Sequence, residues 1–153
     1  MFIHAKQTVT VHRPGAEVFA LVSDPTNEPR WNPTVLRTER LSEQPNGVGT
    51  VYRETHQVIF RQNTMTYEVV SYQPEDQFGI KTLSGGPLQI FQYTLTPHSE
   101  GVQVALSTEV QVPSLLGFLA PLLRRMVGKE SVKSLTRLKQ FLENETTNAL
   151  LPR

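Results

Sequence analysis

The sequence predicts a single α+β domain in which an antiparallel sheet precedes a long C-terminal helix. Apolar and polar residues alternate over 3–11 and over most segments between residues 35 and 112, which is typical of half-buried strands. A helical pattern then fills residues 114–145. The 153 residues suit one domain with its own core, and no repeat or linker divides them, so we expect one domain over 1–153.

The chain begins with a pattern for one strand and two short helices. Residues 3–11 place their apolar side chains on one face of a strand. Pro14 suits the first turn of a helix, because its missing N–H is not needed there, and apolar residues follow at helical spacing as far as Val22. Asp24 and Pro25 then indicate the end of this helix and the N-cap of a second, which prolines downstream keep short.

Six further strands are expected, at 35–42, 50–60, 64–73, 77–83, 88–96 and 102–112. Segments rich in Gly, Pro, Asn and Asp separate most of them. Because these connections are short, sequential strands should pair as antiparallel hairpins. The link at Arg61 could be a tight turn or a bulge within one long ribbon.

The apolar stripe of the C-terminal helical segment changes its phase. At 100° per residue it forms two roughly opposite faces, one of Leu115, Phe118, Leu119, Leu122 and Met126, the other of Val132, Leu135, Leu138 and Leu142. Two helices, or one helix bent near Gly128, would explain the change.

Short motifs in order along nearly the whole chain carry a resemblance to a known family. They are the residues from Pro14 to Asp24, Trp31-Asn32-Pro33, Gly47-Val48-Gly49, 67–74, Tyr93-Thr94-Leu95 before Gly101-Val102, and 135–143. Together they resemble the START-like (SRPBCC) superfamily, specifically its polyketide cyclase/dehydrase and lipid-transport family; Val102 stands where that family often has Thr. The resemblance implies a helix-grip fold: a curved antiparallel sheet of about seven strands (β-α-α-β6-α) wraps the long C-terminal helix and leaves an internal cavity.

The resemblance also implies that the cavity binds a small hydrophobic ligand, such as a lipid, quinone, isoprenoid or aromatic polyketide-like molecule. We expect its contacts from inward strand positions, the C-terminal helix and the sole tryptophan. The candidates are Trp31, Tyr52, Glu54, His56, Met65, Tyr67, Phe91, Tyr93, Leu106, Thr108, Leu119, Leu122, Met126 and Leu135. The alternative is that these side chains only fill the core, because a sequence does not separate packed apolar surface from a cavity wall.

Glu54 and His56 give the chain a second functional hypothesis, a polyketide cyclase or dehydratase. Their strand is more apolar on the face that they share, so both should point inward. A buried carboxyl beside an imidazole could act as a general acid and base, with a cavity tyrosine as a further proton donor. A register error of one residue would place both in solvent, and a buried pair could also merely orient a ligand. The sequence leaves open whether the protein is an enzyme.

Several other functions lack the residues that they need. Cysteine is absent, and the other histidines form no metal-ligand spacing, so we expect no metal. The chain has no Gly-x-Gly-x-x-Gly, Walker or Gly-x-Ser-x-Gly motif, and we expect no cofactor. A formal net charge of +1 gives no general attraction to nucleic acid.

Residues 115–126 form an apolar segment that ends in Arg124 and Arg125. It could pack on the sheet edge, act as a lid or peripheral membrane contact, or mediate a homodimer. Its longest apolar run is under half of the ~20 residues that span a bilayer. The N-terminus lacks the pattern of a signal peptide, so we expect a soluble, cytoplasmic protein.

Overall fold

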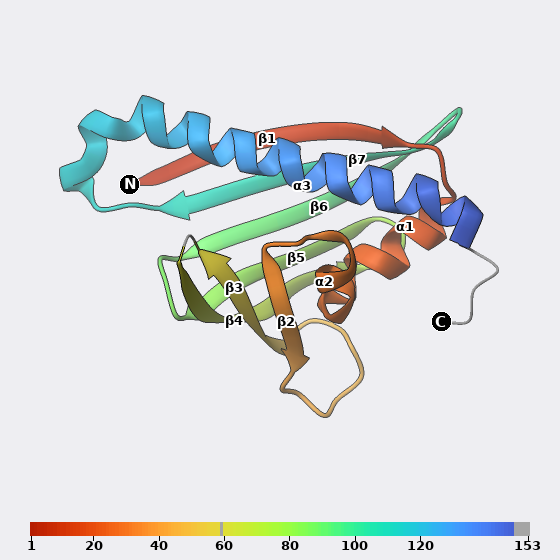
Figure 1. The fold of residues 1–153 in the computed structure, drawn as a ribbon, viewed down its shortest axis with the longest axis horizontal. Helices are drawn as coiled ribbons and strands as arrows, with labels where there is room; N and C mark the ends of the chain where they lie inside the picture. The colour runs from red at the N-terminus through yellow and green to blue at the C-terminus, as the bar shows by residue number, and fades with distance from the viewer. Residues whose placement is uncertain (59, 149–153) are drawn as a thin grey trace.

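The computed structural model describes residues 1–58 and 60–148, and it contains one seven-stranded antiparallel sheet in the order β1-β7-β6-β5-β4-β3-β2 (Figure 1). The strands are β1 (Phe2–Val11), β2 (Val35–Arg40), β3 (Val51–Val58), β4 (Arg61–Gln73), β5 (Gln77–Ser84), β6 (Gln89–His98) and β7 (Gly101–Gln111). All seven expected strands are present. From β2 to β7 each strand pairs with the next along the chain, and β1 pairs with β7.

The link between β3 and β4 is a tight hairpin, in which Val58 pairs with Arg61. The turn alternative is therefore correct and the bulge alternative is wrong. The predicted strand over 50–60 is too long at its C-terminal end, because Phe60 lies in the turn and is 96% exposed. A glycine is required at the start of β7: Gly101 has φ +148°, and an added Cβ would lie 2.1 Å from the carbonyl oxygen of Val11.

Short helices α1 (Gly15–Val22), η1 (Pro25–Asn27) and α2 (Glu28–Trp31) connect β1 to β2. Pro14 is the N-cap of α1 and has extended backbone, so it lies one residue before the first turn in which the sequence analysis placed it. Asp24 caps η1, since its side chain accepts a hydrogen bond from Thr26 N at 3.1 Å. This opening therefore matches the sequence-based expectation of two short helical segments.

The C-terminal segment consists of a 3₁₀ helix, η2 (Ser114–Leu119), and one long helix, α3 (Ala120–Asn148). The two-helix alternative is correct, but a break near Gly128 is wrong, because α3 continues through that residue. The first apolar face does not pack on the sheet: Leu115 is 85% and Phe118 78% exposed. Of the second face, Leu135, Leu138 and Leu142 enter the core, whereas Val132 is 46% exposed and does not. The apolar stripe changes its phase because only this later part of the helix contacts the core.

Helix α3 lies across one face of the sheet and packs mainly on β1 (Figure 1). Leu135, Leu138 and Leu142 enter one apolar core together with strand side chains such as Val104 and Phe78. Burial of these leucines is the main reason that α3 stays on the sheet, because helix propensity alone contributes little. The expected helix-grip arrangement is confirmed.

Candidate functional site

The sheet and α3 enclose a cavity of about 710 Å³. Its wall comes from α1 and α2, from the inner faces of β3 to β7, and from α3. The cavity lies beside the core, so that one face of the sheet supplies both. A volume of this size is within the range of small-molecule sites in proteins.

Aromatic and aliphatic side chains form most of the wall. They are Leu21, Val22, Trp31, Met65, Tyr67, Phe78, Ile80, Phe91, Tyr93, Leu106, Val110, Met126 and Val127. Tyr67 and Phe91 meet edge to face, with ring centroids 6.4 Å apart. The strand members alternate with outward residues, as the period of two predicts.

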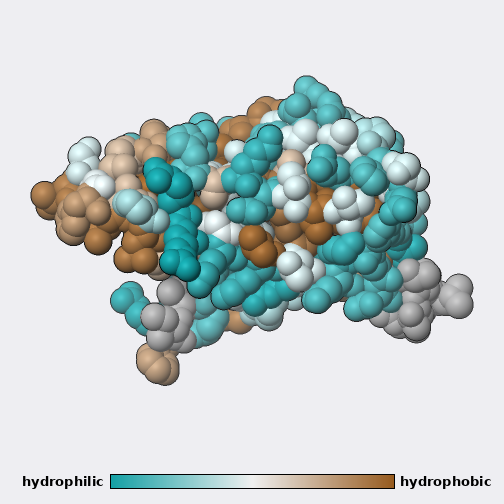
Figure 2. Space-filling view, turned by 90° about the horizontal axis from the view of Figure 1, so that it is seen from above, coloured by the Kyte–Doolittle hydropathy of each residue, from teal (hydrophilic) through white to brown (hydrophobic). Residues whose placement is uncertain are grey.

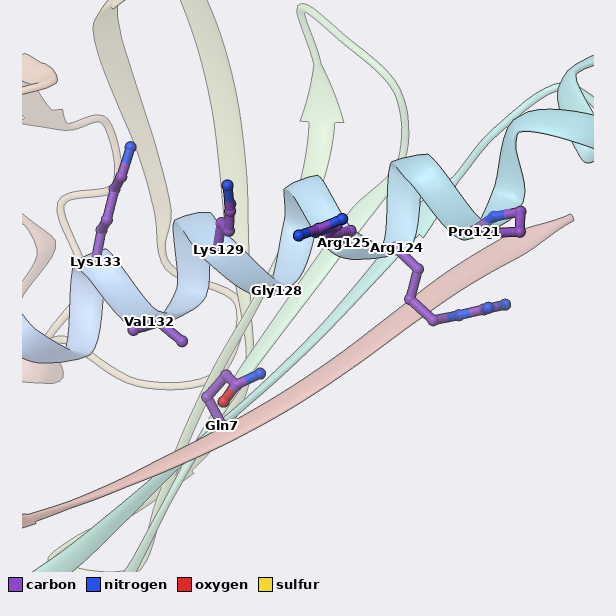
Figure 3. A pocket seen from close by; sticks show the side chains of 8 residues that line it. All are labelled: Gln7, Pro121, Arg124, Arg125, Gly128, Lys129, Val132 and Lys133. Carbon is purple, nitrogen blue, oxygen red and sulfur yellow. The ribbon is translucent and has the colours of Figure 1, made fainter.

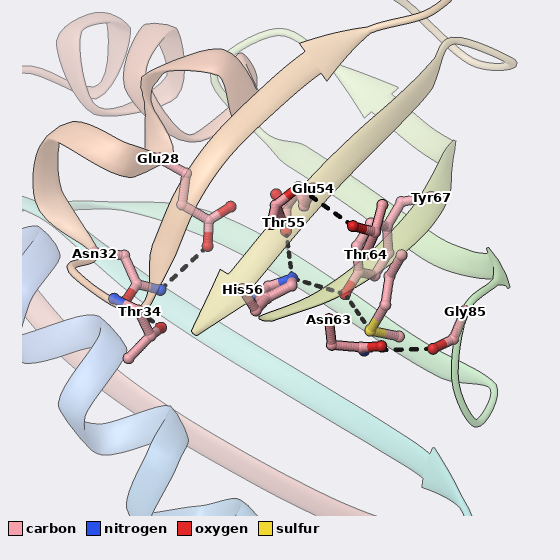
Figure 4. A network of polar contacts seen from close by, with 11 residues as sticks. Glu28, Asn32, Thr34, Glu54, Thr55, His56, Asn63, Thr64, Tyr67 and Gly85 are labelled. Carbon is pink, nitrogen blue, oxygen red and sulfur yellow. Dashed lines mark hydrogen bonds and ion pairs between the residues drawn. The ribbon is translucent and has the colours of Figure 1, made fainter. Parts of the chain in front are cut away.

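A polar cluster interrupts this wall at the inner face of β3 and β4 (Figure 4). His56 Nε2 lies 3.1 Å from Glu54 Oε2 and 3.5 Å from the hydroxyl of Tyr67. The Glu54 side chain is 4% exposed, whereas His56 remains partly open to the cavity. The inward register of β3 is therefore confirmed, and it brings Glu54 and His56 to the site together.

Glu28, at the start of α2, is the residue of this cluster that our sequence analysis missed. Its Oε1 accepts a hydrogen bond from Asn32 Nδ2 at 3.2 Å, and Asn32 Oδ1 in turn accepts from Thr34 Oγ1 at 2.8 Å. Figure 4 draws Glu28 and Glu54 extending from α2 and β3 into the same region. The one available signal was the spacing of four residues between Glu28 and Asn32, which places both on one face of a helix.

Burial and mutual charge shift the proton equilibria of the cluster. Burial raises the pKa of Glu28 well above its usual range, and the negative charge of Glu54 raises it further. Burial also raises the pKa of Glu54, and the neighbouring Glu28 carboxyl opposes this change. Repulsion between the two carboxylates favours a state in which one of them keeps a proton. Burial lowers the pKa of His56, with the charge of Glu28 opposing the change, so the imidazole favours its neutral form.

Two cavity tyrosines stay protonated. Burial raises the pKa of Tyr67 and of Tyr93, and the charges of Glu28 and Glu54 add to both effects. The hydroxyl of Tyr67 lies 3.4 Å from the sulfur of Met65, a weak acceptor, in addition to its contact with His56. It is therefore a neutral hydrogen-bond donor at the cavity wall.

Ten of the fourteen ligand-binding candidates lie on this wall: Trp31, Glu54, His56, Met65, Tyr67, Phe91, Tyr93, Leu106, Thr108 and Met126. Four do not. Tyr52 is fully buried and donates a hydrogen bond to Asn46 Oδ1 at 2.7 Å, and burial raises its pKa to about 12. Leu135 is in the core, while Leu119 and the exposed Leu122, unlike Met126 of the same apolar face, are not among the residues that line the cavity.

Within residues 1–58 and 60–148, no group of three or more His, Asp or Glu side chains is arranged to hold a metal ion. The arrangement can enclose an apolar body, offer hydrogen bonds from Tyr67 and His56, and move a proton between Glu54 and His56.

Fold and cavity together define a helix-grip domain with an internal, mostly apolar chamber. The chain belongs to the polyketide cyclase / dehydrase and lipid transport family, which residues 3–143 match. A search of curated protein sequences finds no significant match.

Solved structures of the same fold include aromatase/cyclases and a START superfamily protein by name. The Zhui aromatase/cyclase from Streptomyces sp. R1128 is 19% identical with a TM-score of 0.77, covering 95% of this chain and 96% of that one. A START superfamily protein from Mycobacterium smegmatis is 16% identical with a TM-score of 0.78, covering 92% and 97%. The di-domain ARO/CYC StfQ from the steffimycin biosynthetic pathway is 18% identical with a TM-score of 0.78. The match covers 96% of this chain but only 52% of StfQ, so this chain spans about half of that protein. At these identities the likeness shows the fold alone.

Proposed function

We propose that the protein binds a small hydrophobic molecule, such as a lipid, quinone, isoprenoid or aromatic polyketide-like compound, in the cavity between sheet and α3. The observation that carries this proposal is the cavity of about 710 Å³, whose wall is mainly aromatic and aliphatic. Burying ~300 Å² of apolar ligand surface would contribute roughly 7–8 kcal/mol before the costs of association. Micromolar affinity requires about 8 kcal/mol net, so polar anchors such as Tyr67 and His56 matter.

The first experiment is native mass spectrometry of the purified protein, repeated after denaturation. A mass surplus that disappears on denaturation would identify a retained ligand and its chemical class. Titration with the neutral dye N-phenyl-1-naphthylamine then tests the cavity directly, whether or not a ligand is retained. A dye that gains no fluorescence with ligand-free protein would overturn the proposal.

Blocking the cavity should abolish dye binding without unfolding the chain. Ser134 lies on the cavity wall, and tryptophan at this position would occupy part of the chamber. We expect Ser134→Trp to bind the dye at least about tenfold more weakly, a loss of about 1.4 kcal/mol. The matched control is Thr136→Trp, because Thr136 lies on the same helix with its side chain in solvent.

Equal dye affinity in both variants, with circular dichroism showing that both are folded, would place the binding elsewhere. Loss of dye affinity in Thr136→Trp alone would also place the binding site outside this cavity. The expected pattern is therefore a selective loss in Ser134→Trp.

Acid–base catalysis of the cyclase or dehydratase type is the second candidate. The observation that favours it is the 3.1 Å contact of Glu54 and His56, since burial has displaced both pKa values toward each other. Tyr67 adds a neutral proton donor to the pair. Variants Glu54→Gln and His56→Ala separate the candidates: turnover lost with binding retained supports catalysis, whereas binding without any turnover supports a carrier.

A further proposal concerns contact with an anionic membrane through residues 115–126. Hydrophobic side chains gather at one end of the molecule, over η2 and the start of α3 (Figure 2). Next to them an open groove between α3 and β1 is bordered by Arg124, Arg125, Lys129 and Lys133 (Figure 3). Exposed apolar residues beside such cations are typical of interfacial helices. No helix in the described part of the chain is long and apolar enough to cross a bilayer.

Charge reversal at the groove should weaken liposome binding. We expect wild type to co-sediment with vesicles that contain phosphatidylserine and the variant R124E/R125E to lose most of this binding, because about 1 kcal/mol is associated with each cation near an anionic surface. The control K6E/K81E makes the same charge change at Lys6 and Lys81, which alternate with residues facing α3 and the core. Unchanged co-sedimentation of R124E/R125E would contradict the proposed membrane contact. A concentration-dependent dimer without lipid would assign the apolar residues to a homodimer contact.

A further inference from the structure

We propose that the cavity selects ligands whose polar end is a hydroxyl or ammonium hydrogen-bond donor, placed at the carboxyl pair Glu28 and Glu54, and that it rejects ligands with an anionic head group. This inference rests on the proposed ligand-binding function and specifies its ligand class. The charges on the wall and one buried, unpartnered oxygen atom carry it.

The charged side chains on the cavity wall are acidic. They are Asp24, Glu28, Glu54 and Glu130, of which the exposed Glu130 pairs with Lys133 (Oε1 to Nζ, 3.4 Å). No lysine or arginine is among the described residues that line the cavity. His56 does not offset them, since burial lowers its pKa and favours the neutral ring. Arg137 donates a hydrogen bond from Nη1 to Oδ1 of the wall residue Asn32 at 3.4 Å, and Arg137 itself is not among the residues that line the cavity. An anionic head group would therefore enter a chamber that offers it no cation.

Glu54 Oε1 is the buried oxygen that lacks a partner. Its other oxygen, Oε2, lies 3.1 Å from His56 Nε2, whereas Oε1 has no hydrogen-bond partner among the described residues. The wall holds one more unpartnered polar atom, the indole Nε1 of Trp31.

A ligand donor would satisfy the atom that the protein leaves without one. Burying a carboxylate oxygen without a hydrogen bond is costly, more so than for a neutral group. A ligand hydroxyl can donate to Glu54, and an ammonium group can replace the proton of Glu28 and let both carboxyls ionise. A carboxylate or phosphate on the ligand would instead add a negative charge beside a buried one, which is unfavourable at short range.

Four probes with ten-carbon chains test this selectivity: 1-decanol, decylammonium, 2-decanone and decanoate, at pH 7. A change in the fluorescence of Trp31, the only tryptophan, reports binding because this residue lies on the wall. We expect 1-decanol and decylammonium to bind, and 2-decanone and decanoate to bind at least about tenfold more weakly, which is about 1.4 kcal/mol. The relative affinity of 1-decanol and decylammonium distinguishes a hydroxyl ligand from an amine ligand.

The variant E28Q/E54Q removes both buried carboxyls and keeps the side-chain shapes. We expect it to bind decanoate and 1-decanol within about threefold of each other, because the repulsion is gone and the amides can donate. The control E68Q makes the same kind of substitution at Glu68, on β4 between two inward residues, and should keep the wild-type order.

The outcomes separate the two proposals. Decanoate that binds wild type as tightly as 1-decanol overturns the selectivity inference and leaves ligand binding intact. The same conclusion follows if E28Q/E54Q still binds 1-decanol more tightly than decanoate, as wild type does. If this variant does not fold, the wild-type probe series alone tests the selectivity. Failure of all four probes and of N-phenyl-1-naphthylamine overturns both proposals.

Discussion

Replacing Leu138 by alanine is expected to lower the free energy of unfolding by about 2–5 kcal/mol. Leu138 is 0% exposed and packs in the cluster that joins α3 to the inner face of the sheet. The substitution removes apolar contacts and leaves a void in a region where the sheet cannot readily collapse. Because α3 also forms part of the cavity wall, dye affinity should fall together with stability.

Urea unfolding followed by Trp31 fluorescence measures this loss. Thr136→Ala is the matched control on the same helix, and we expect it to change stability by no more than about 0.5 kcal/mol because Thr136 is exposed. A loss in Leu138→Ala as small as in the control would mean that α3 is not held by its apolar face.

Replacing Glu28 by glutamine is expected to stabilise the protein at alkaline pH and to leave it nearly unchanged in acid. The pKa of Glu28 is raised in the folded chain, so its contribution to stability is present below the unfolded value of about 4.3 and is lost as pH rises through the folded pKa. An amide at this position can donate to Glu54 at every pH. We expect a gain of about 1–3 kcal/mol at pH 9, the usual effect of relieving an unsatisfied buried polar group.

The test compares urea unfolding of wild type and Glu28→Gln between pH 5 and pH 9. The two stability curves should separate as pH rises. His56 acts in the opposite direction: its lowered pKa gives stability above the unfolded value of about 6.5 that is lost as pH falls through the folded pKa, and both proteins share that loss. Parallel curves, or an equal gain in the control Glu68→Gln, would contradict the role given to Glu28.

The strand side of the site could be predicted because its signal is local. Alternation with a period of two places Glu54, His56, Met65 and Tyr67 on one face, and one buried face fixes the register. The helix side could not be predicted in the same way. Leu122 and Met126 have the same spacing pattern as core residues and are both more than half exposed, yet only Met126 of the two is among the residues that line the cavity.

The sequence by itself determined the order of elements, the antiparallel pairing, the caps of the short helices and the inward face of β3, because each depends on periodicity, short connections or the backbone preferences of Pro, Gly and Asp. Only the tertiary structure decided which of two apolar faces of the C-terminal segment is buried, and that Glu28, from a different element, meets Glu54. A contact between residues far apart in the sequence depends on how α2 and α3 sit on the sheet. So does the choice between a filled core and an open cavity, since both are lined by the same kinds of side chain.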